Sequence, residues 1–247
     1  MPAAPGTSAG SAAAPGDALP EANRRARLIF ELRGRRFPLP LVRGSVGAES
    51  TLMLVDTGAN SHVLSGWFAR KLGLPLRKLG DLGTDHAGRP VATYLVEEAE
   101  VVLEGWGSLG RGPYLAADVP AALEALGIGA FLSPQQLPRE DRVVLLDLPG
   151  RDLAEAFPEE GVARLGARGK PIVPRGARHC IDGDSTVRGL AFVVPAKLEG
   201  RAVDLLLDTG ALRTDVLSAS SAGASLLPRS VPGRDALIAA SGRIITR

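Results

Sequence analysis

The chain has 247 residues, of which 45% are hydrophobic and only 4% aromatic, and its formal net charge is +2. A chain of this length can bury one large or two modest cores, and here they must be built from aliphatic side chains. So small a net charge does not indicate a nucleic-acid partner, and a single cysteine, Cys180, excludes an intramolecular disulfide.

Residues 1–36 are predicted to form a flexible arm. The first 20 are rich in Ala, Pro, Gly and Ser and lack the basic-then-apolar order of a secretory signal. Residues 24–36 hold six arginines and are interpreted as a solvated, poorly ordered stretch, with an acidic partner as the alternative. No apolar run approaches membrane-spanning length. The sequence does not distinguish a cytoplasmic from a periplasmic location.

Residues 37–149 are predicted to form a first β lobe. Strands are expected at Pro38–Val42 and Thr51–Val55, and the second strand ends directly in Asp56-Thr57-Gly58-Ala59. A short helix is expected over 67–72, capped by Ser65 and ended by Gly73, and strands are expected again over 91–103.

Residues 150–187 are rich in Gly, Pro and charge and are predicted to connect this lobe to a second one at 188–247. The second lobe opens as the first does. A strand at Leu190–Val194, a turn at Glu199-Gly200 and a strand at Ala202–Leu207 lead to Asp208-Thr209-Gly210-Ala211.

The repeated Asp-Thr-Gly-Ala is the central motif of the chain. A bare Asp-Thr-Gly arises by chance in roughly one chain of this composition in ten, and strand-to-turn junctions favour Asp and Gly in any case. Here, however, both copies follow an apolar run and precede a polar stretch and Val-Leu-Ser. Two equivalent carboxylates, each at the end of a strand, are what a two-aspartate acid/base catalyst needs.

These loops resemble those of the retropepsin/pepsin superfamily of aspartic proteases, in the bacterial retropepsin-like form. The segment Leu126–Leu132 is similar to the apolar-apolar-Gly element that supports the aspartate loop in that family, and Val143–Pro149 to the strand that follows it. The resemblance implies a mainly β acid-protease fold, with two pseudo-twofold-related lobes and few short helices.

The resemblance also implies a role for each motif residue. Asp56 and Asp208 would meet across the lobe interface and share one proton, as the two active-site aspartates of aspartic proteases do. The threonine hydroxyls would bond to the opposite loop, the glycines would let backbone N–H groups approach the carboxylates, and the alanines would keep the cleft floor small. The supporting residues are Thr57, Gly58, Ala59, Thr209, Gly210 and Ala211.

A lid over such a cleft has two candidates. One is the turn at Asp85–Arg89, and the other is the stretch Ala240–Ile245, which also contains Gly-Arg before apolar residues. A generic hairpin is an equal alternative for each. Tyr94 is expected to pack in a strand and not to reach the cleft.

Other patterns carry no chemistry. Gly105–Gly110 has the GxGxxG spelling, but Gly112-Pro113 blocks the helix that a dinucleotide site requires, so a hairpin turn is expected. The three histidines lie too far apart to indicate a zinc site, and no serine lies in a nucleophile-elbow sequence. No cofactor or metal is therefore predicted.

The leading hypothesis is an aspartic endopeptidase that acts on a peptide or protein substrate through Asp56 and Asp208. Only 39 residues follow Asp208, and they contain no counterpart of Leu126–Leu132, so the second lobe is expected to be incomplete. Two alternatives follow: a peptide-binding or scaffold protein of the same fold, or a homodimer whose site uses Asp56 from two chains.

Overall fold

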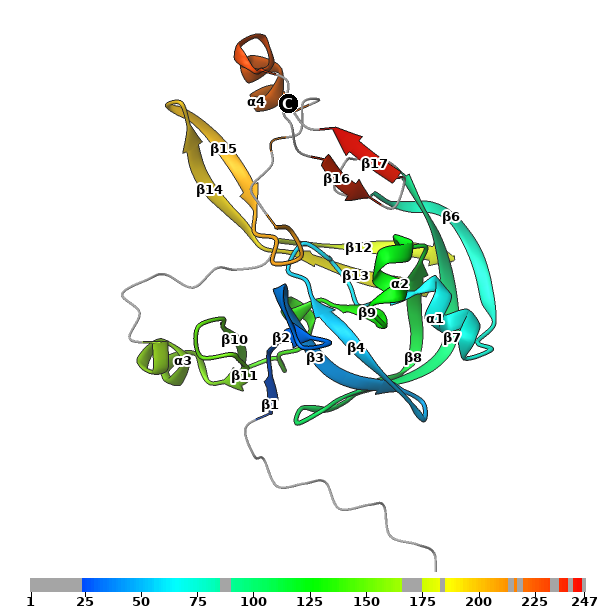
Figure 1. Ribbon diagram of the computed structural model, residues 1–247. Helices are drawn as coiled ribbons and strands as arrows, with labels where there is room; N and C mark the ends of the chain where they lie inside the picture. The colour runs from blue at the N-terminus through cyan, green and yellow to red at the C-terminus, as the bar shows by residue number, and fades with distance from the viewer. Residues whose placement is uncertain are drawn as a thin grey trace, which may run out of the picture.

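The computed structural model describes residues 24–84, 90–165, 175–182, 185–212, 216, 220–231, 236–239 and 242–245. These residues form a mainly β structure around one large sheet (Figure 1). The strands of that sheet are β2 (Ile29–Leu32), β3 (Arg35–Val46), β4 (Glu49–Val55), β5 (Val63–Ser65), β6 (Leu76–Thr84), β7 (Pro90–Leu103), β8 (Gly107–Ala117) and β9 (Ile128–Leu132).

The order of strands across this sheet is β2-β3-β4-β9-β5-β8-β7-β6, and β3 also pairs with β7. This extra pairing joins strands from opposite halves of the sheet, which therefore curves back on itself. The core on its inner side is aliphatic, as the composition predicts. Its largest fully buried side chains include Met53, Leu64, Leu103, Leu132 and one aromatic residue, Phe68.

The placement of β9 creates the first aspartate loop. Strand β9 lies between β4 and β5, parallel to β4 and antiparallel to β5. The chain that leaves β4 at Val55 must therefore pass over the end of β9 before it enters β5 at Val63. Residues 56–62 form that crossing, and the Asp56 N–H donates to the Leu132 carbonyl of β9 at 2.9 Å.

Gly129 in β9 is required by close packing. A Cβ at this position would lie 2.4 Å from Oγ1 of Thr51 and 2.7 Å from the ring of Phe68, both nearer than real Cβ contacts come. Any side chain would push β9 away from β4 and from the helix behind it. The glycine of the predicted support element is thus explained by sterics alone.

The predicted short helix is present as α1 (Gly66–Lys71), with Leu72 as its C-cap and Gly73 at φ +68°. Ser65 stands at the N-cap position but does not cap with its side chain. Its buried hydroxyl donates instead to the Ile128 carbonyl at 3.0 Å. The tertiary contact with β9 replaces the local cap that the sequence favours.

The expectation of a flexible arm is wrong for residues 24–36. They form β1 (Arg25–Arg27), β2 and the start of β3, while residues 1–23 lie outside the described residues. Ala26 and Leu28 alternate with the arginines, and both are buried. A period of two places the apolar side chains inward and the arginines outward, so the stretch is a strand and not a solvated tail.

The expected connector is also partly ordered. Strand β11 (Asp152–Ala156) is buried along its whole length and pairs with both β10 (Val143–Asp147) and β1. Helix α3 (Pro158–Leu165) follows it. The strand that the resemblance implies at Val143–Pro149 is β10. Strands β1 and β11 extend the packed part of the first lobe in both directions along the sequence.

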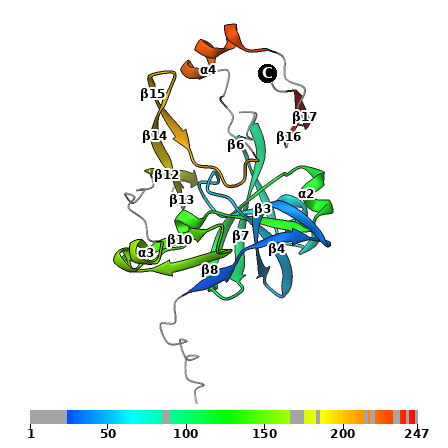
Figure 2. The ribbon, with the colours of Figure 1, turned by 60° about the vertical axis from the view of Figure 1, so that its left-hand side comes forward.

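The described strands after α3 form separate hairpins. They are β12 (Arg175–Asp182) with β13 (Ser185–Ala191), β14 (Val193–Leu198) with β15 (Arg201–Leu206), and β16 (Ala236–Ala239) with β17 (Gly242–Ile245). Hairpin β14–β15 extends away from the large sheet, and β16–β17 lies beside one end of β6 in both views (Figures 1 and 2). The predicted turn at Glu199-Gly200 lies between β14 and β15, with both residues at positive φ.

The second lobe has little core of its own. Among residues 191–212, 216 and 220–231, only Gly223 of α4 (Ser221–Leu226) is buried. Apolar side chains such as Leu206 (48% exposed), Leu212 (67%) and Val231 (75%) face outward. The described part of this lobe is therefore much less packed than the first lobe.

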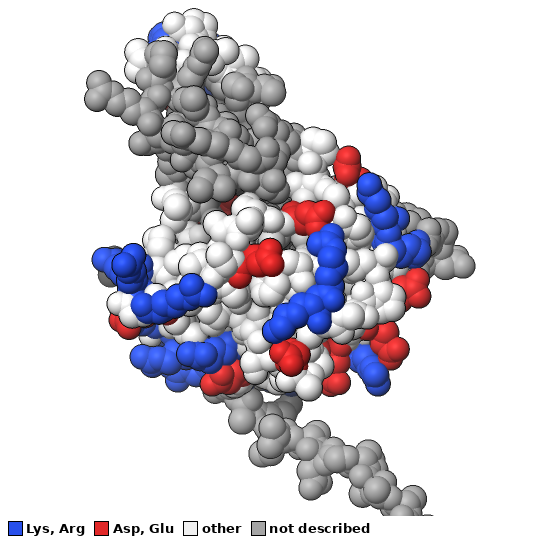
Figure 3. Space-filling view, turned by 45° about the vertical axis from the view of Figure 1, so that its right-hand side comes forward, with Lys and Arg blue, Asp and Glu red and all other residues white. Residues whose placement is uncertain are grey.

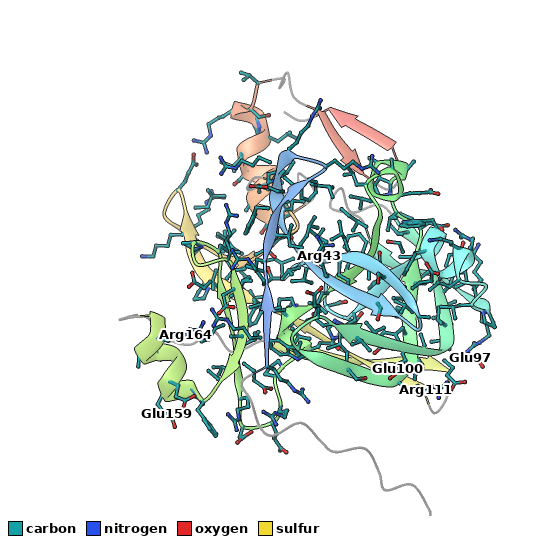
Figure 4. The ribbon with its side chains drawn as sticks, turned by 60° about the horizontal axis from the view of Figure 1, so that its bottom comes forward. Arg43, Glu97, Glu100, Arg111, Glu159 and Arg164 are labelled. Carbon is teal, nitrogen blue, oxygen red and sulfur yellow. The ribbon has the colours of Figure 1, made fainter. Side chains whose placement is uncertain are left out.

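Charges of both signs mix across the face drawn in Figure 3. On the outer strands, Glu97, Glu100 and Arg111 lie close together in Figure 4. The ion pairs there, Arg77 with Glu97 at 3.2 Å and Arg111 with Glu98 at 2.9 Å, are exposed. Exposed pairs contribute about 0–1 kcal/mol each, so they do not determine the fold. Within the described ranges, no helix is long and apolar enough to cross a membrane.

Candidate active site

The first aspartate loop holds its carboxylate with its own backbone. The N–H groups of Gly58 and Ala59 donate to Oδ1 of Asp56 at 2.8 and 3.1 Å. Because Asp56 directly follows the buried end of β4, its Cα is fixed by the sheet while its carboxylate is fixed by the turn. Both predicted supporting residues therefore contact the acid through backbone donors.

The second loop repeats this arrangement at the end of β15. The Leu207 N–H donates to the Phe192 carbonyl at 2.9 Å, which fixes the chain just before Asp208. The Gly210 N–H then donates to Oδ1 of Asp208 at 2.8 Å. The Ala211 N–H donates to the Asp208 main-chain carbonyl at 3.4 Å and not to the carboxylate. The two loops are thus similar but not identical.

The two threonines exchange hydrogen bonds between the loops. The Thr57 hydroxyl donates to the Leu207 carbonyl at 2.7 Å and accepts from the Thr209 N–H at 3.0 Å. The Thr209 hydroxyl does the same in return, with the Val55 carbonyl at 2.7 Å and the Thr57 N–H at 3.1 Å. Each hydroxyl acts as donor and acceptor, so four bonds join segments about 150 residues apart.

Each carboxylate packs over the glycine of the opposite loop. A Cβ on Gly58 would lie 2.6 Å from Cγ of Asp208, and a Cβ on Gly210 would lie 2.7 Å from Cγ of Asp56. Only hydrogen at these two positions leaves room for the acids. The two predicted aspartates are therefore brought together, face to face, between the loops that carry them.

This environment disfavours ionisation of both acids at once. Burial, the nearby charge of Asp208 and a hydrogen bond with the Asp208 carboxyl raise the pKa of Asp56 from 3.8 to about 7. The N–H groups of Gly58 and Ala59 oppose that rise because they stabilise the carboxylate. Near neutral pH the pair consequently holds a proton that two separate, solvated aspartates would have lost.

Sequence reasoning missed the residues that support the first loop from behind. Gln135, in the 3-10 turn η1 (Pro134–Gln136), donates from Nε2 to the carbonyls of Thr57 and Ala59 at 3.1 and 2.7 Å. Gln136 donates to the Asn60 carbonyl at 2.6 Å. These residues occur once and match no repeat, so only their position directly after the β9 element could have drawn attention to them.

His62 closes the same loop. The Ser133 N–H donates to its Nδ1 at 3.1 Å, so that nitrogen carries no proton, and burial lowers the pKa of the imidazole from 6.5 to about 4. Between these two values the unfolded chain binds a proton at His62 that the folded chain does not. The free energy of unfolding therefore decreases as the pH falls through this window.

We expect His62→Gln, which keeps an acceptor for the Ser133 N–H, to reduce the loss of unfolding free energy as the pH falls from 6.5 to 4. The lost contribution in the wild-type protein amounts to at most about 3 kcal/mol between pH 6.5 and pH 4. Urea unfolding at a series of pH values measures it. An unchanged slope in the variant would mean that other groups cause the acid destabilisation.

The remaining candidates lie outside the site or outside the described residues. The lid candidates fall on hairpins β6–β7 and β16–β17, but residues 85–89, 240 and 241 are not described. Tyr94 packs in its strand, as expected, and its hydroxyl donates to Asp118 at 3.0 Å. The GxGxxG spelling begins in the predicted turn between β7 and β8, at Gly105 and Trp106, and its remaining residues, 107–110, begin β8. In the described parts of the chain, no group of three or more His, Cys, Asp or Glu could hold a metal ion.

Comparison with known proteins supports the resemblance that the motifs indicate. Residues 42–120 match the family described as aspartyl protease, a range that contains the Asp56 loop and ends before Asp208. The crystal structure of a retropepsin-like aspartic protease from Rickettsia conorii is similar over 56% of this chain and 96% of that chain, with 16% identity and a TM-score of 0.34. No curated protein sequence matches the chain.

The family match supports the predicted resemblance to aspartic proteases over residues 42–120, and the described residues have the mainly β fold that the resemblance implies. The family match also supports aspartic protease activity in general terms.

Proposed function

We propose that this retropepsin-like aspartic protease chain is an endopeptidase whose catalytic pair is Asp56 and Asp208. The observation that carries the proposal is the reciprocal packing of each carboxylate over the glycine of the other loop. A structural salt bridge joins an acid to a base and not to a second acid. Burial of two carboxyl groups against each other costs folding free energy, so this arrangement favours a catalytic role.

In the proposed reaction, the pair holds one proton and a water molecule lies between the two carboxyl groups. The ionised aspartate removes a proton from the water, which attacks the carbonyl carbon of the peptide bond. The protonated aspartate donates its hydrogen bond to the carbonyl oxygen, where negative charge develops. The aspartate that took the proton from water then gives it to the amide nitrogen, the C–N bond breaks, and the carboxylic acid and amine products leave. No cofactor takes part.

The raised pKa of Asp56 gives this proposal a pH signature. The active pair carries one proton, and that proton is lost as the pH rises through about 7. We expect kcat/KM for a peptide substrate to decrease above this pH and to increase again on return to lower pH. The fit of the rate to a titration curve measures the apparent pKa of the pair.

The direct test is cleavage of a peptide library, with products identified by mass spectrometry. Cleavage should be blocked by a statine-type peptide, whose hydroxyl resembles the attacking water, and should be unaffected by a metal chelator or a serine-directed reagent. Activity that resists the statine peptide but is lost with either of the other reagents would contradict the proposal.

A peptide-binding or scaffold role remains the second candidate, and one observation favours it. The second lobe has almost no buried residue among those described, so the Asp208 loop lacks the packed sheet that supports Asp56. In that case the purified protein would bind the statine peptide, as measured by calorimetry, and would cleave no member of the library.

A homodimer that uses Asp56 from two chains is less well supported. The partners that the Asp56 loop would need from a second copy are already supplied by residues 207–210 of the same chain. Formation of such a dimer would require the four threonine hydrogen bonds and both glycine contacts to be broken and made again.

A further inference from the structure

The first aspartate loop has a buried polar support that the motif does not include. Gln135 is only 3% exposed, and it lies behind the loop, at the end of β9. Its Nε2 group donates to two main-chain carbonyls of the motif, those of Thr57 and Ala59. One amide group therefore uses both of its hydrogens on the three-residue segment that wraps around the Asp56 carboxylate.

The Thr57 carbonyl has a direct link to the acid. It belongs to the same peptide unit as the Gly58 N–H, which donates to Oδ1 of Asp56 at 2.8 Å. The bonds from Gln135 to the peptide and from the peptide to Asp56 therefore form one continuous chain. A donor at the carbonyl end polarises the peptide and makes its N–H a stronger donor, because hydrogen bonds in series reinforce one another.

The second contact restrains the orientation of the loop. The Ala59 N–H also donates to Oδ1 of Asp56, and the Ala59 carbonyl on the other side of that residue accepts from Gln135 at 2.7 Å. Gln135 thus bonds the Thr57–Gly58 and Ala59–Asn60 peptides, which flank the Gly58–Ala59 peptide. Rotation of the first would turn the Gly58 N–H away from the carboxylate, and rotation of the second would loosen the neighbouring peptide, which carries the Ala59 N–H.

We infer that Gln135 is a positioning residue, which holds the Thr57–Ala59 segment so that its N–H groups point at the Asp56 carboxylate. It acts on Asp56 through the peptide units that its side chain bonds. This inference rests on the proposed function only for its catalytic consequence. The link to Asp56 itself can be measured whether or not the protein cleaves peptides.

The test compares Gln135→Met with Gln135→Glu. Methionine has similar length and no donor, so both carbonyls lose their partner. A glutamic acid buried against two carbonyls stays protonated and donates one bond, which restores part of the support. Gln136→Met is the matched control, because Gln136 contacts the Asn60 carbonyl, beyond the two N–H donors.

The first measurement is a titration of the Asp56 carboxyl carbon by ¹³C NMR. Asp208 is the charged group that acts on the Asp56 carboxyl across the pair, and His62, at the end of the same loop, is neutral above a pH of about 4 because burial lowers its pKa. Neither is altered by the variants. We expect the midpoint for Asp56 to move to higher pH in Gln135→Met, to move less in Gln135→Glu, and to stay in place in Gln136→Met.

The second measurement is kinetic. We expect Gln135→Met to lower kcat about tenfold, less than the roughly 100-fold loss for removal of a donor that touches the reacting groups, with little change in KM. The alkaline limb of the rate should move in the same direction as the NMR midpoint. A variant that only contained less folded protein would show a lower rate at every pH, and the alkaline decrease in rate would occur at the same pH as in the wild type.

An unchanged NMR midpoint in both Gln135 variants would overturn the inference. If Gln135→Met does not fold, Gln135→Glu decides the question by the same titration. A moved midpoint in a protein that cleaves no peptide would support the positioning role and contradict the proposed function, so the two can fail separately.

Discussion

Asp56→Asn and Asp208→Asn are each expected to lower kcat/KM for peptide cleavage by about 10⁴-fold, the order of loss found when one member of a catalytic unit is removed. An amide can neither accept the proton from water nor share a proton with the remaining acid. The reciprocal contact of the two carboxylates makes each dependent on the other. The double variant should therefore be no less active than either single one.

Stability distinguishes this loss from unfolding. The raised pKa of Asp56 means that its ionised form is less stable in the folded chain than in the unfolded chain. Its cost to stability appears as the pH rises from 3.8 through about 7, so Asp56→Asn should be at least as stable as the wild type above that range.

The control for these variants is Asp141→Asn, at an acid whose side chain is 70% exposed, for which no loss is expected. Full activity in Asp208→Asn, together with loss in Asp56→Asn, would move the site to a homodimer.

Gly58→Ala and Gly210→Ala are expected to lower kcat about 100-fold each, although no reacting group is removed. The added methyl carbon would lie within 2.7 Å of Cγ of the opposite aspartate, so that carboxylate must move by about 1 Å. A displacement of this size separates the pair and weakens the shared hydrogen bond. Steady-state kinetics measure the effect.

Gly112→Ala is the matched control, because a Cβ there has no neighbour within 4 Å and the backbone is not in the left-handed region. It should keep full activity. Crystal structures of the two loop variants would reveal the carboxylate displacement directly. Wild-type rates in Gly58→Ala would show that the close contact with Asp208 does not matter for the reaction.

The parts of the site that the sequence predicts are those with a local or repeated pattern. The apolar approach to Asp56 predicts the end of a strand, and the second copy at Asp208 predicts a partner for it. The support element at Leu126–Leu132 is recognisable because Gly129 lies within an apolar run, and the structure places it between β4 and β5. Such patterns need no knowledge of distant contacts.

The parts that could not be predicted depend on distant pairing. Strand β1 is ordered because it pairs with β11, 127 residues away along the chain, and Arg25 bonds Asp152 across that pair. Six arginines in a short stretch indicate solvent exposure unless the partner strand is known. Gln135 was missed for the same reason, since its partners lie 76 and 78 residues earlier.

The inequality of the two aspartate loops has a consequence for how a peptide would lie. A site made by two identical chains has a true twofold axis, so a substrate can enter in either of two equivalent directions. Here Asp56 receives two N–H donors and Asp208 receives one among the described residues, so the halves differ. Under the proposed function, a peptide would therefore meet different surroundings in its two possible directions, and we expect one direction to be preferred.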